Sequence, residues 1–404
     1  KTQLDYTCLK ANQKVTETEL VYDLNSLYDY FSRIPDTRSK LGKQYPLTLL
    51  LIWNLLAKLA GQDKPSAIAE WVAHRQSLWI EYRLTPKAKT ASHMTYRRVL
   101  AETVSCEALE DVLTRYHRQQ LQEGEEIVLS LDGKTVRGTI PAGECQGIHL
   151  LAVYVPERGL VLAEAAVGRK ENEIVVVPQV LRQVNLAGKI VIADALHTQK
   201  SFCQELVAAG AEYVLTAKGN QSHTRWAIEK LFVPEACNLQ KGARLSRDFQ
   251  SFVQIQKGHG RIEKRIILTS TRLNEYLDDW PGLAQVFRIE KRVWYAQGAR
   301  YTRSIRYGFT SLSPSQAGPE RILTLVKEYW GIESGLHYRR DVTLQEDATR
   351  LTVGQAGHAM AIFNNLAIGL CLIHRHNVAS ARRYFDAHPR KALDLLLSAN
   401  PKSL

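Results

Sequence analysis

The chain has 404 residues, of which 45% are hydrophobic and 23% charged, so its composition is that of a globular protein and excludes a disordered or fibrous one. A formal net charge of +12 favours a polyanionic partner, most commonly nucleic acid. No run approaches 18 apolar residues, so we expect no membrane partner. No CxxC pair occurs among the six cysteines, so we expect reduced thiols in a cytoplasmic protein, with no zinc site and no disulfide framework.

The first 120 residues are predicted to be helical. Two amphipathic segments, 45–61 and 64–83, are separated by a turn at "GQDKP". A third helical segment begins after Ser92, a suitable N-cap, and places Arg97 and Arg98 in its second turn. Helices joined by a short basic loop fit a helix-turn-helix against DNA, and they fit a plain helical packing domain equally well.

An α/β region is predicted after Gly124. The apolar strand "EIVLSLDG" is expected to end at Asp132, and the later strand "GKIVIAD" ends at Asp194. The other elements expected here are strands at 147–155 and 159–167, a helix from about Glu173 despite Pro178, a helix at 199–209, a strand at 212–219 and a helix near 222–231. This order predicts a sheet with mixed strand directions.

A second β-rich region follows, from about residue 237 to 313. Residues 252–310 hold 11 Lys/Arg against 5 Asp/Glu, interleaved with aromatic residues: Trp294, Tyr295, Tyr301 and Tyr307. A long helix then starts near Pro319. Its apolar stripe includes Leu325 and Tyr329 and continues to Glu333, which is an unusual place for an acid.

Three carboxylates are candidates for a metal site. Asp132 and Asp194 follow apolar strands, and open α/β sheets bind ligands outside the carboxyl ends of their strands. With Glu333 from a helix, they provide the oxygen ligands that Mg²⁺ prefers. Two such ions roughly 4 Å apart activate water and stabilise the leaving oxygen of a phosphodiester. The alternative is that the aspartates cap turns and that Glu333 lies at the edge of a packed face.

Several blocks of sequence resemble H-repeat-associated insertion-sequence transposases, which are DDE transposases with an RNase H-like fold. The blocks are "LSLDGKTVRGT", "VIADALHTQK", "TAKGNQ", "KGHGRIEKR" and "YWGIESGLHYRRDVTLQEDATR". "IPDTRSKLGKQYPLTLLLIWNLLAKLAG" and "SHMTYRRVL" are similar to the family's associated helical domain. The resemblance covers roughly residues 30–375, in the family's order.

The resemblance implies an RNase H-like mixed sheet with helices, interrupted by a β-rich insertion domain and preceded by an all-α domain. The corresponding segments are a helical domain (1–120), the catalytic domain in two parts (121–236 and 314–375), the insertion (237–313) and a basic tail (376–404). Glu333 follows Asp194 by 139 residues, and in related transposases a β-rich domain that grips DNA fills this gap.

The resemblance also implies a function. Asp132, Asp194 and Glu333 become the catalytic triad that binds two Mg²⁺ or Mn²⁺ ions. The expected partners are DNA, as terminal inverted repeats and as target, and a second copy of the chain, giving at least a homodimer in a nucleoid-associated synaptic complex. The Tyr-(2)-Arg-(3)-Glu-(6)-Lys signature of a related group falls on Val326, Tyr329, Glu333 and Arg340; only the last keeps a cation, so a hairpin pathway is not implied.

Other polar residues near these motifs are candidate DNA contacts, against the alternative of solvated or turn-forming side chains. They are Arg97, Arg98, Lys134, Arg137, His197, Lys218, Asn220, Gln221, His259, Arg261, Arg265 and Arg340. Glu346 and Asp347 are interpreted as a solvated or arginine-paired cluster. Two other functions stay open, a nuclease that cuts without joining and a domesticated DNA-binding protein without catalysis.

Overall fold

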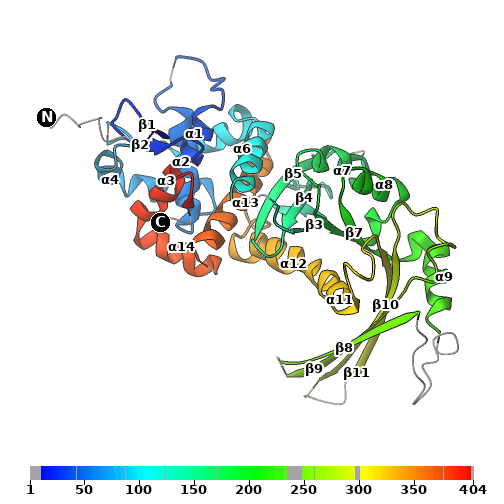
Figure 1. Ribbon diagram of the computed structural model, residues 1–404. Coiled ribbons are helices and arrows are strands. Elements are labelled where there is room, and N and C mark those ends of the chain that lie inside the picture. Colours follow the sequence, from blue (N-terminus) through cyan, green and yellow to red (C-terminus); the bar gives the residue numbers. More distant parts are fainter. Residues whose placement is uncertain are drawn as a thin grey trace. The chain divides into compact units, whose positions relative to one another are not determined.

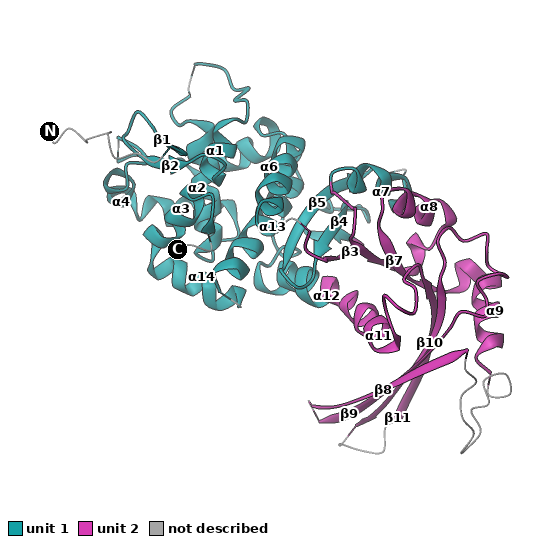
Figure 2. Cartoon of the chain, viewed as in Figure 1, with its two compact units in different colours: residues 1–123, 133–183, 334–404 teal, residues 124–132, 184–333 magenta. Residues whose placement is uncertain are grey.

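The computed structural model describes residues 11–401 except 42, 87, 123, 170, 234–247, 259, 296–300 and 376. The chain forms two compact units (Figure 2). Unit 1 comprises residues 1–123, 133–183 and 334–404, and unit 2 comprises residues 124–132 and 184–333. The predicted domain boundaries at 120, 236, 313 and 375 stay a prediction; within unit 2, strands of the expected insertion join the same sheet as the strand before them.

The N-terminal part of unit 1 is helical, as predicted, apart from a small hairpin of β1 (Gln13–Val15) and β2 (Val21–Asp23). Its helices are α1 (Leu27–Ser32), α2 (Leu47–Leu59), α3 (Pro65–Ala73), α4 (Gln76–Glu81), α5 (His93–Arg98) and α6 (Cys106–Arg118), with a π-helical turn at Val99–Thr103. α2, which was predicted to be amphipathic, is buried along almost its whole length, and Asn54 and Lys58 are buried together with its apolar residues. Ser92 is the N-cap of α5, but its side chain makes no capping hydrogen bond.

The C-terminal part of unit 1 contains α13 (Ala356–His374), α14 (Val378–Ala387) and α15 (Pro389–Leu397). α13 is long and apolar enough to cross a membrane, but 83% of its most apolar window is buried inside the protein, as expected of a core helix. The predicted basic tail is thus folded: Phe385 of α14 and Leu396 of α15 are fully buried.

Unit 1 also contains β4 (Ile148–Val155) and β5 (Leu160–Val167), an antiparallel pair that matches the strands predicted at 147–155 and 159–167. They are followed by α7 (Glu173–Leu181), which Asn172 caps and which contains Pro178, as predicted. β4 also neighbours β3 (Val128–Val136), whose residues from Gly133 onward belong to unit 1. The prediction that this strand ends at Asp132 is therefore wrong, because β3 continues to Val136 with β4 as its neighbour.

Unit 2 is built on a mixed sheet in the order β3-β6-β7-β11-β10-β9-β8 (Figure 1). β3, β6 (Ile190–Ala193) and β7 (Glu212–Ala217) are parallel, whereas the remaining strands are antiparallel to their neighbours: β8 (Phe249–Gly258), β9 (Arg261–Ser270), β10 (Gln285–Tyr295) and β11 (Tyr301–Thr310). The mixed α/β prediction is confirmed.

The helices of unit 2 are α8 (Lys200–Ala208), α9 (Ser222–Leu231), α11 (Pro319–Glu328) and the short α12 (Trp330–Ile332). One face of the sheet packs on α11, where Ile267 and Ile289 form a buried core with Ile322 and Leu325. This packing places the residues that follow α11 beside the sheet. Of the cysteines, the structure describes Cys106, Cys145, Cys203 and Cys371, all free thiols; Cys8 and Cys237 lie outside the described residues.

Candidate active site

Asp132 and Asp194 occupy equivalent positions on neighbouring parallel strands. The register of β3 and β6 ends at Leu131 opposite Ala193, so Asp132 is the next residue of β3 and Asp194 is the residue directly after β6. Neighbouring strands lie about 4.8 Å apart, which brings the two backbones together. Asp194 also caps the 3₁₀ turn that follows it, because its Oδ1 accepts a hydrogen bond from the backbone N of Leu196 at 2.6 Å.

Glu333 begins a π-helical turn, Glu333–His337, directly after α12. Turns of this kind inside helices are frequent at functional sites. Glu333 is exposed, although we expected it to face inward with the apolar stripe. Together with Asp194 it lines a cavity of about 410 Å³ in unit 2.

The side chain of Tyr329 interacts electrostatically with all three acids of the predicted triad. Burial raises the pKa of its phenol most strongly, and the charges of Asp132, Asp194 and Glu333 raise that pKa further. The phenol hydrogen-bonds to Asp132 and lines the cavity. The sequence identified Tyr329 only as an apolar residue that departs from a family signature; its position four residues before Glu333, on the same helical face, was the available signal.

Basic and aromatic side chains also line this cavity. Lys218 was a predicted DNA contact, whereas Arg225, Arg306 and Trp330 were not predicted. The Arg306 guanidinium lies over the Trp330 ring, 4.3 Å from its centroid. Burial lowers the pKa of Arg306, and the charge of Glu333 partly offsets this. The cavity therefore presents positive charge beside two of the acids, an arrangement suited to a phosphate group.

Asn220 and Gln221 hold the loop that follows Asp194. The side-chain amide of Asn220 donates to the carbonyl of Ala195, and that of Gln221 donates to the carbonyl of Thr198 at 2.8 Å. These bonds use the amides that we expected to contact DNA. His197 in the same loop is only 2% exposed and packs beside Phe202, which does not favour a phosphate contact.

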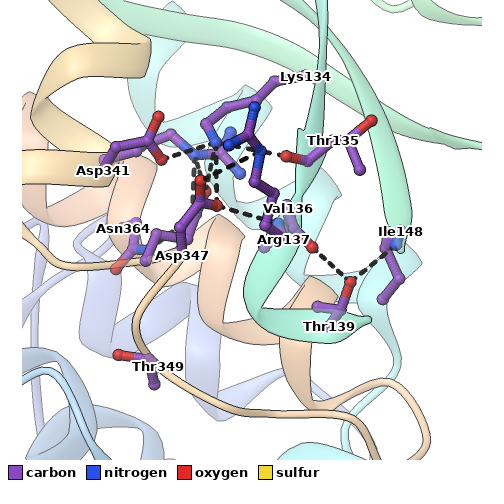
Figure 3. Close-up of polar contacts among 12 residues, drawn as sticks. Lys134, Thr135, Val136, Arg137, Thr139, Ile148, Asp341, Asp347, Thr349 and Asn364 are labelled. Atoms are coloured by element: carbon purple, nitrogen blue, oxygen red, sulfur yellow. Dashed lines mark hydrogen bonds and ion pairs between the residues drawn. The ribbon is translucent and has the colours of Figure 1, made fainter. Parts of the chain in front are cut away.

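A second group of acids lies in unit 1 (Figure 3). Within the described residues, one set of three ligand atoms lies within 4.8 Å of one another, from Asp341, Glu346 and Asp347; the predicted triad is more open. Nζ of Lys134 lies 2.7 Å from Asp341 and 3.4 Å from Asp347, so this cluster already contains a cation. Lys134 is 8% exposed, which does not support its expected contact with DNA. Arg137, in contrast, is exposed.

Arg340 is 1% exposed, and this burial does not favour a direct DNA contact. Its guanidinium donates to Glu164 and to Glu346, both at 2.9 Å. Asn364 donates to Glu346 at 2.7 Å and Asn365 to Glu164 at 3.0 Å. Burial alone would raise the pKa of Glu346, but Arg340 outweighs it and the pKa is lowered. Arginine pairing was one of the two interpretations of Glu346, and it is confirmed.

The remaining predicted contacts differ in their exposure. Arg97 and Arg98 are exposed in the last turn of α5. Arg261 is exposed and Arg265 is buried, and both pair with Glu263. His259 lies outside the described residues.

Replacing Tyr329 by Phe should increase the response of the protein to Mg²⁺. The substitution removes a hydrogen bond to a carboxylate, typically about 1.5–3 kcal/mol at a buried site, and leaves the metal-free acids less stabilised. We expect a lower melting temperature in EDTA and a larger rise on adding Mg²⁺, measured by thermal denaturation. Tyr307→Phe, in the same cavity wall, is the matched control; equal Mg²⁺ responses in the two variants would contradict the prediction.

Comparison with known proteins decides the family. Residues 123–370 match the family described as Transposase DDE domain, and residues 28–117 match the one described as DDE_Tnp_1-associated. The chain belongs to the DDE transposases. This transposase is 28% identical to the putative transposase YncI of Escherichia coli O157:H7 over 358 residues, covering 86% of the chain and 87% of that protein.

A second relative of the transposase is the H repeat-associated putative transposase YhhI of Escherichia coli K12, with 23% identity over 370 residues, 89% of this chain and 94% of the relative. The predicted family is thus confirmed, and the protein is an enzyme of the transposase type. A structure of piggyBac transposase in a synaptic complex with hairpin DNA aligns with 86% of this chain and 80% of its own, at 12% identity and a TM-score of 0.39.

Proposed function

We propose that this transposase cuts DNA at the terminal inverted repeats of an insertion sequence and joins the freed 3′-OH to target DNA. The observation that supports the proposal most is that Asp132 and Asp194 follow paired residues of neighbouring parallel strands, and that Glu333 lines the same cavity as Asp194. Two of these acids line a cavity that basic side chains also line. Acids and cations together suit a reaction at a phosphodiester, where the substrate is anionic and its charge rises during displacement.

We assign the metal site to Asp132, Asp194 and Glu333. Their donors are carboxylate oxygens, which fit hard divalent cations such as two Mg²⁺ or Mn²⁺ ions, and none of the three is fully buried. The acids of unit 1 fit less well because Lys134 already neutralises them. When bound, the ions would supply Lewis-acid stabilisation and a water activated for attack.

The residues of the chain hold and orient the DNA in this proposal. Lys218, Arg225 and Arg306 offer charge-assisted hydrogen bonds to phosphates beside the acids. Asn220 and Gln221 fix the loop that carries Asp194, so that this carboxylate keeps its direction when DNA enters. Cleavage and joining are both displacements at phosphorus, so a single site serves both and no covalent enzyme intermediate is needed.

The proposal extends to the fold and the assembly. An RNase H-like catalytic core is supported by the mixed directions of the strands around β3, namely the parallel β3, β6 and β7 and the antiparallel β4–β5 pair. Joining both ends of an element requires two active sites, so we propose at least a homodimer on DNA.

The proposed function is tested by supplying pre-cleaved ends with free 3′-OH groups, a plasmid target and Mg²⁺. The end sequence comes from the inverted repeats that flank the gene. We expect plasmid molecules covalently joined to the end, detected by gel electrophoresis and sequencing across the junction. Cleavage of intact ends without joined product would identify a nuclease instead. Binding of ends without either reaction would identify a non-catalytic DNA-binding protein.

A further inference from the structure

Two glycines closely follow acids of the predicted triad in the chain. Gly133 is bonded directly to Asp132 within β3. Gly335 comes two residues after Glu333 in the π-helical turn. At each glycine, a polar side chain of unit 1 lies where a Cβ atom would stand. Neither glycine has a positive φ, so the close approach of these side chains, and not the backbone conformation, requires glycine at both positions.

The side chains that lie against Gly133 belong to a chain of hydrogen bonds. A Cβ atom on Gly133 would lie 2.3 Å from Oε1 of Glu173 and 2.6 Å from Nε2 of His149, closer than a carbon atom approaches either. Nε2 donates to Oε1 of Glu173 at 2.8 Å, since a carboxylate can only accept. Nδ1 of His149 lies 2.8 Å from the hydroxyl of Thr135. Moving Glu173 or His149 to admit a Cβ atom would therefore disturb a bond that fixes its partner.

Gly335 is packed in a similar way against Tyr154 of β4. A Cβ atom on Gly335 would lie 2.7 Å from Oη of Tyr154, whereas the next atoms of the ring would be 3.5 Å away, an ordinary contact. Tyr154 is fully buried, so its ring has no solvent to move into. The carbonyl of Gly335 also accepts a hydrogen bond from the Arg339 guanidinium at 2.8 Å. Burial raises the pKa of the Tyr154 phenol and the charge of Arg339 opposes this rise, so the same guanidinium interacts with both groups.

One strand carries two of these contacts. His149 and Tyr154 both belong to β4, which is buried except for its first two residues and pairs with β5 along its length. Five residues of a strand span about 16 Å. A buried, paired strand does not stretch, because every backbone N–H and C=O that it would release is costly to leave unpaired. The contacts of β4 therefore fix how far the segment that begins at Gly133 lies from the turn that contains Gly335.

We propose that Glu173, His149 and Tyr154 are positioning residues that set the spacing of two metal-binding acids before an ion arrives. The acids are Asp132 and Glu333, so the proposal rests on the proposed function, which assigns them as ligands. Carboxylates that share an ion repel one another while it is absent, so the ion-free chain must hold them in place. Mg²⁺ demands a nearly ideal octahedral geometry, so a small displacement of a ligand lowers the affinity. A single methyl group added at either glycine should therefore weaken metal binding.

The test measures Mn²⁺ binding to the full chain in complex with pre-cleaved terminal-repeat ends, without target DNA. The EPR signal of free Mn²⁺ gives the dissociation constant. Gly335→Ala should raise this constant about 10–100-fold, the usual effect of losing a group that orients a metal ligand. Tyr154→Phe removes the Oη atom that the added Cβ would meet, so the double variant Tyr154→Phe, Gly335→Ala should return to within about threefold of Tyr154→Phe alone.

The contact at Gly133 is tested in the same titration. Gly133→Ala and Glu173→Ala should each weaken Mn²⁺ binding about 10–100-fold. Glu173→Gln should stay within about threefold of the parent, since its amide oxygen still accepts the hydrogen bond from His149. Gly318→Ala, where the added Cβ meets no atom within 4 Å, is the matched control and should bind Mn²⁺ like the parent.

Parent-like Mn²⁺ affinity in Gly133→Ala and Gly335→Ala would overturn the proposal. Equal losses in Glu173→Ala and Glu173→Gln would also overturn it, because Glu173 would then act through its charge, as a ligand does. Fewer Mn²⁺ sites and a lower melting temperature at unchanged affinity would leave the contacts only a role in folding. In these cases Asp132→Asn and Glu333→Gln should still weaken Mn²⁺ binding, and the proposed function would stand. If those two variants bind Mn²⁺ like the parent, both proposals fail.

Discussion

Each of the substitutions Asp132→Asn, Asp194→Asn and Glu333→Gln should lower Mg²⁺-dependent cleavage of cognate ends by more than about a hundredfold. Losing an outer partner of a metal ligand typically costs about 10–100-fold, and losing a ligand itself costs more. The reason is that each of the three carboxylates is assigned as a metal ligand, and the amide that replaces it carries no charge to hold a divalent cation. Cleavage of end-labelled DNA, measured as a single-turnover rate at saturating protein, gives the loss directly.

Two matched variants separate this site from its alternatives. Glu320→Gln removes an exposed carboxylate from α11 and should leave the cleavage rate unchanged. Asp347→Asn alters the acid cluster around Lys134 and should keep the rate within about threefold, because Lys134 already serves as the cation of that cluster. If Asp347→Asn abolished cleavage while the triad variants retained it, the metal site would have to be reassigned to unit 1.

Replacing Arg340 by Met should lower the free energy of unfolding by about 3–5 kcal/mol, the usual cost of removing one partner from a buried ion pair. The substitution leaves Glu164 and Glu346 buried without their main cation. Urea denaturation at neutral pH measures the change. Glu346 contributes fully to the free energy of unfolding above its unfolded pKa of about 4.5, and this contribution is lost as the pH falls through its lowered folded pKa. The difference in unfolding free energy between Arg340→Met and the parent should therefore shrink in acid.

Replacing the two unpaired carboxylates by amides tests whether their charge causes this loss of unfolding free energy. Adding Glu164→Gln and Glu346→Gln to Arg340→Met should recover part of the unfolding free energy, because no buried charge then lacks a partner. Arg350→Met replaces an exposed arginine in the same segment and should change the unfolding free energy by less than about 0.5 kcal/mol. Unchanged stability in Arg340→Met, together with weaker DNA binding, would restore Arg340 as a DNA contact.

Local patterns in the sequence were sufficient for most elements. An apolar run that ends at an acid located β6 and Asp194, and the length and position of an apolar segment located α7 in spite of its proline. The end of β3 was misplaced, since Asp132 and Gly133 resemble a strand terminus. The strand continues because β4 lies alongside it, and pairing between strands is not visible in a local window.

The partners of polar residues were the least predictable part of the site. Arg340 was a candidate DNA contact because it keeps the cation at the last position of the family signature, but its partner Glu164 lies 176 residues away. Asn220 was predicted to contact DNA, and its amide instead binds the loop after Asp194. Arg306 reaches the cavity from β11, through a strand pairing that no motif signals. Spacing in the sequence identifies candidate residues, whereas folding across long separations decides which groups they meet.

The antiparallel pairing of β11 with β7 has a mechanical consequence. It runs from Tyr307 opposite Ala217 to Thr310 opposite Val214, so the long strands extend the sheet that contains β7. Lys218 follows directly after β7, and so do Asn220 and Gln221, whose amides hold the loop after Asp194. We expect a force on the far end of these strands to reach the loop that follows Asp194, because paired backbone and the Gln221–Thr198 hydrogen bond connect the two.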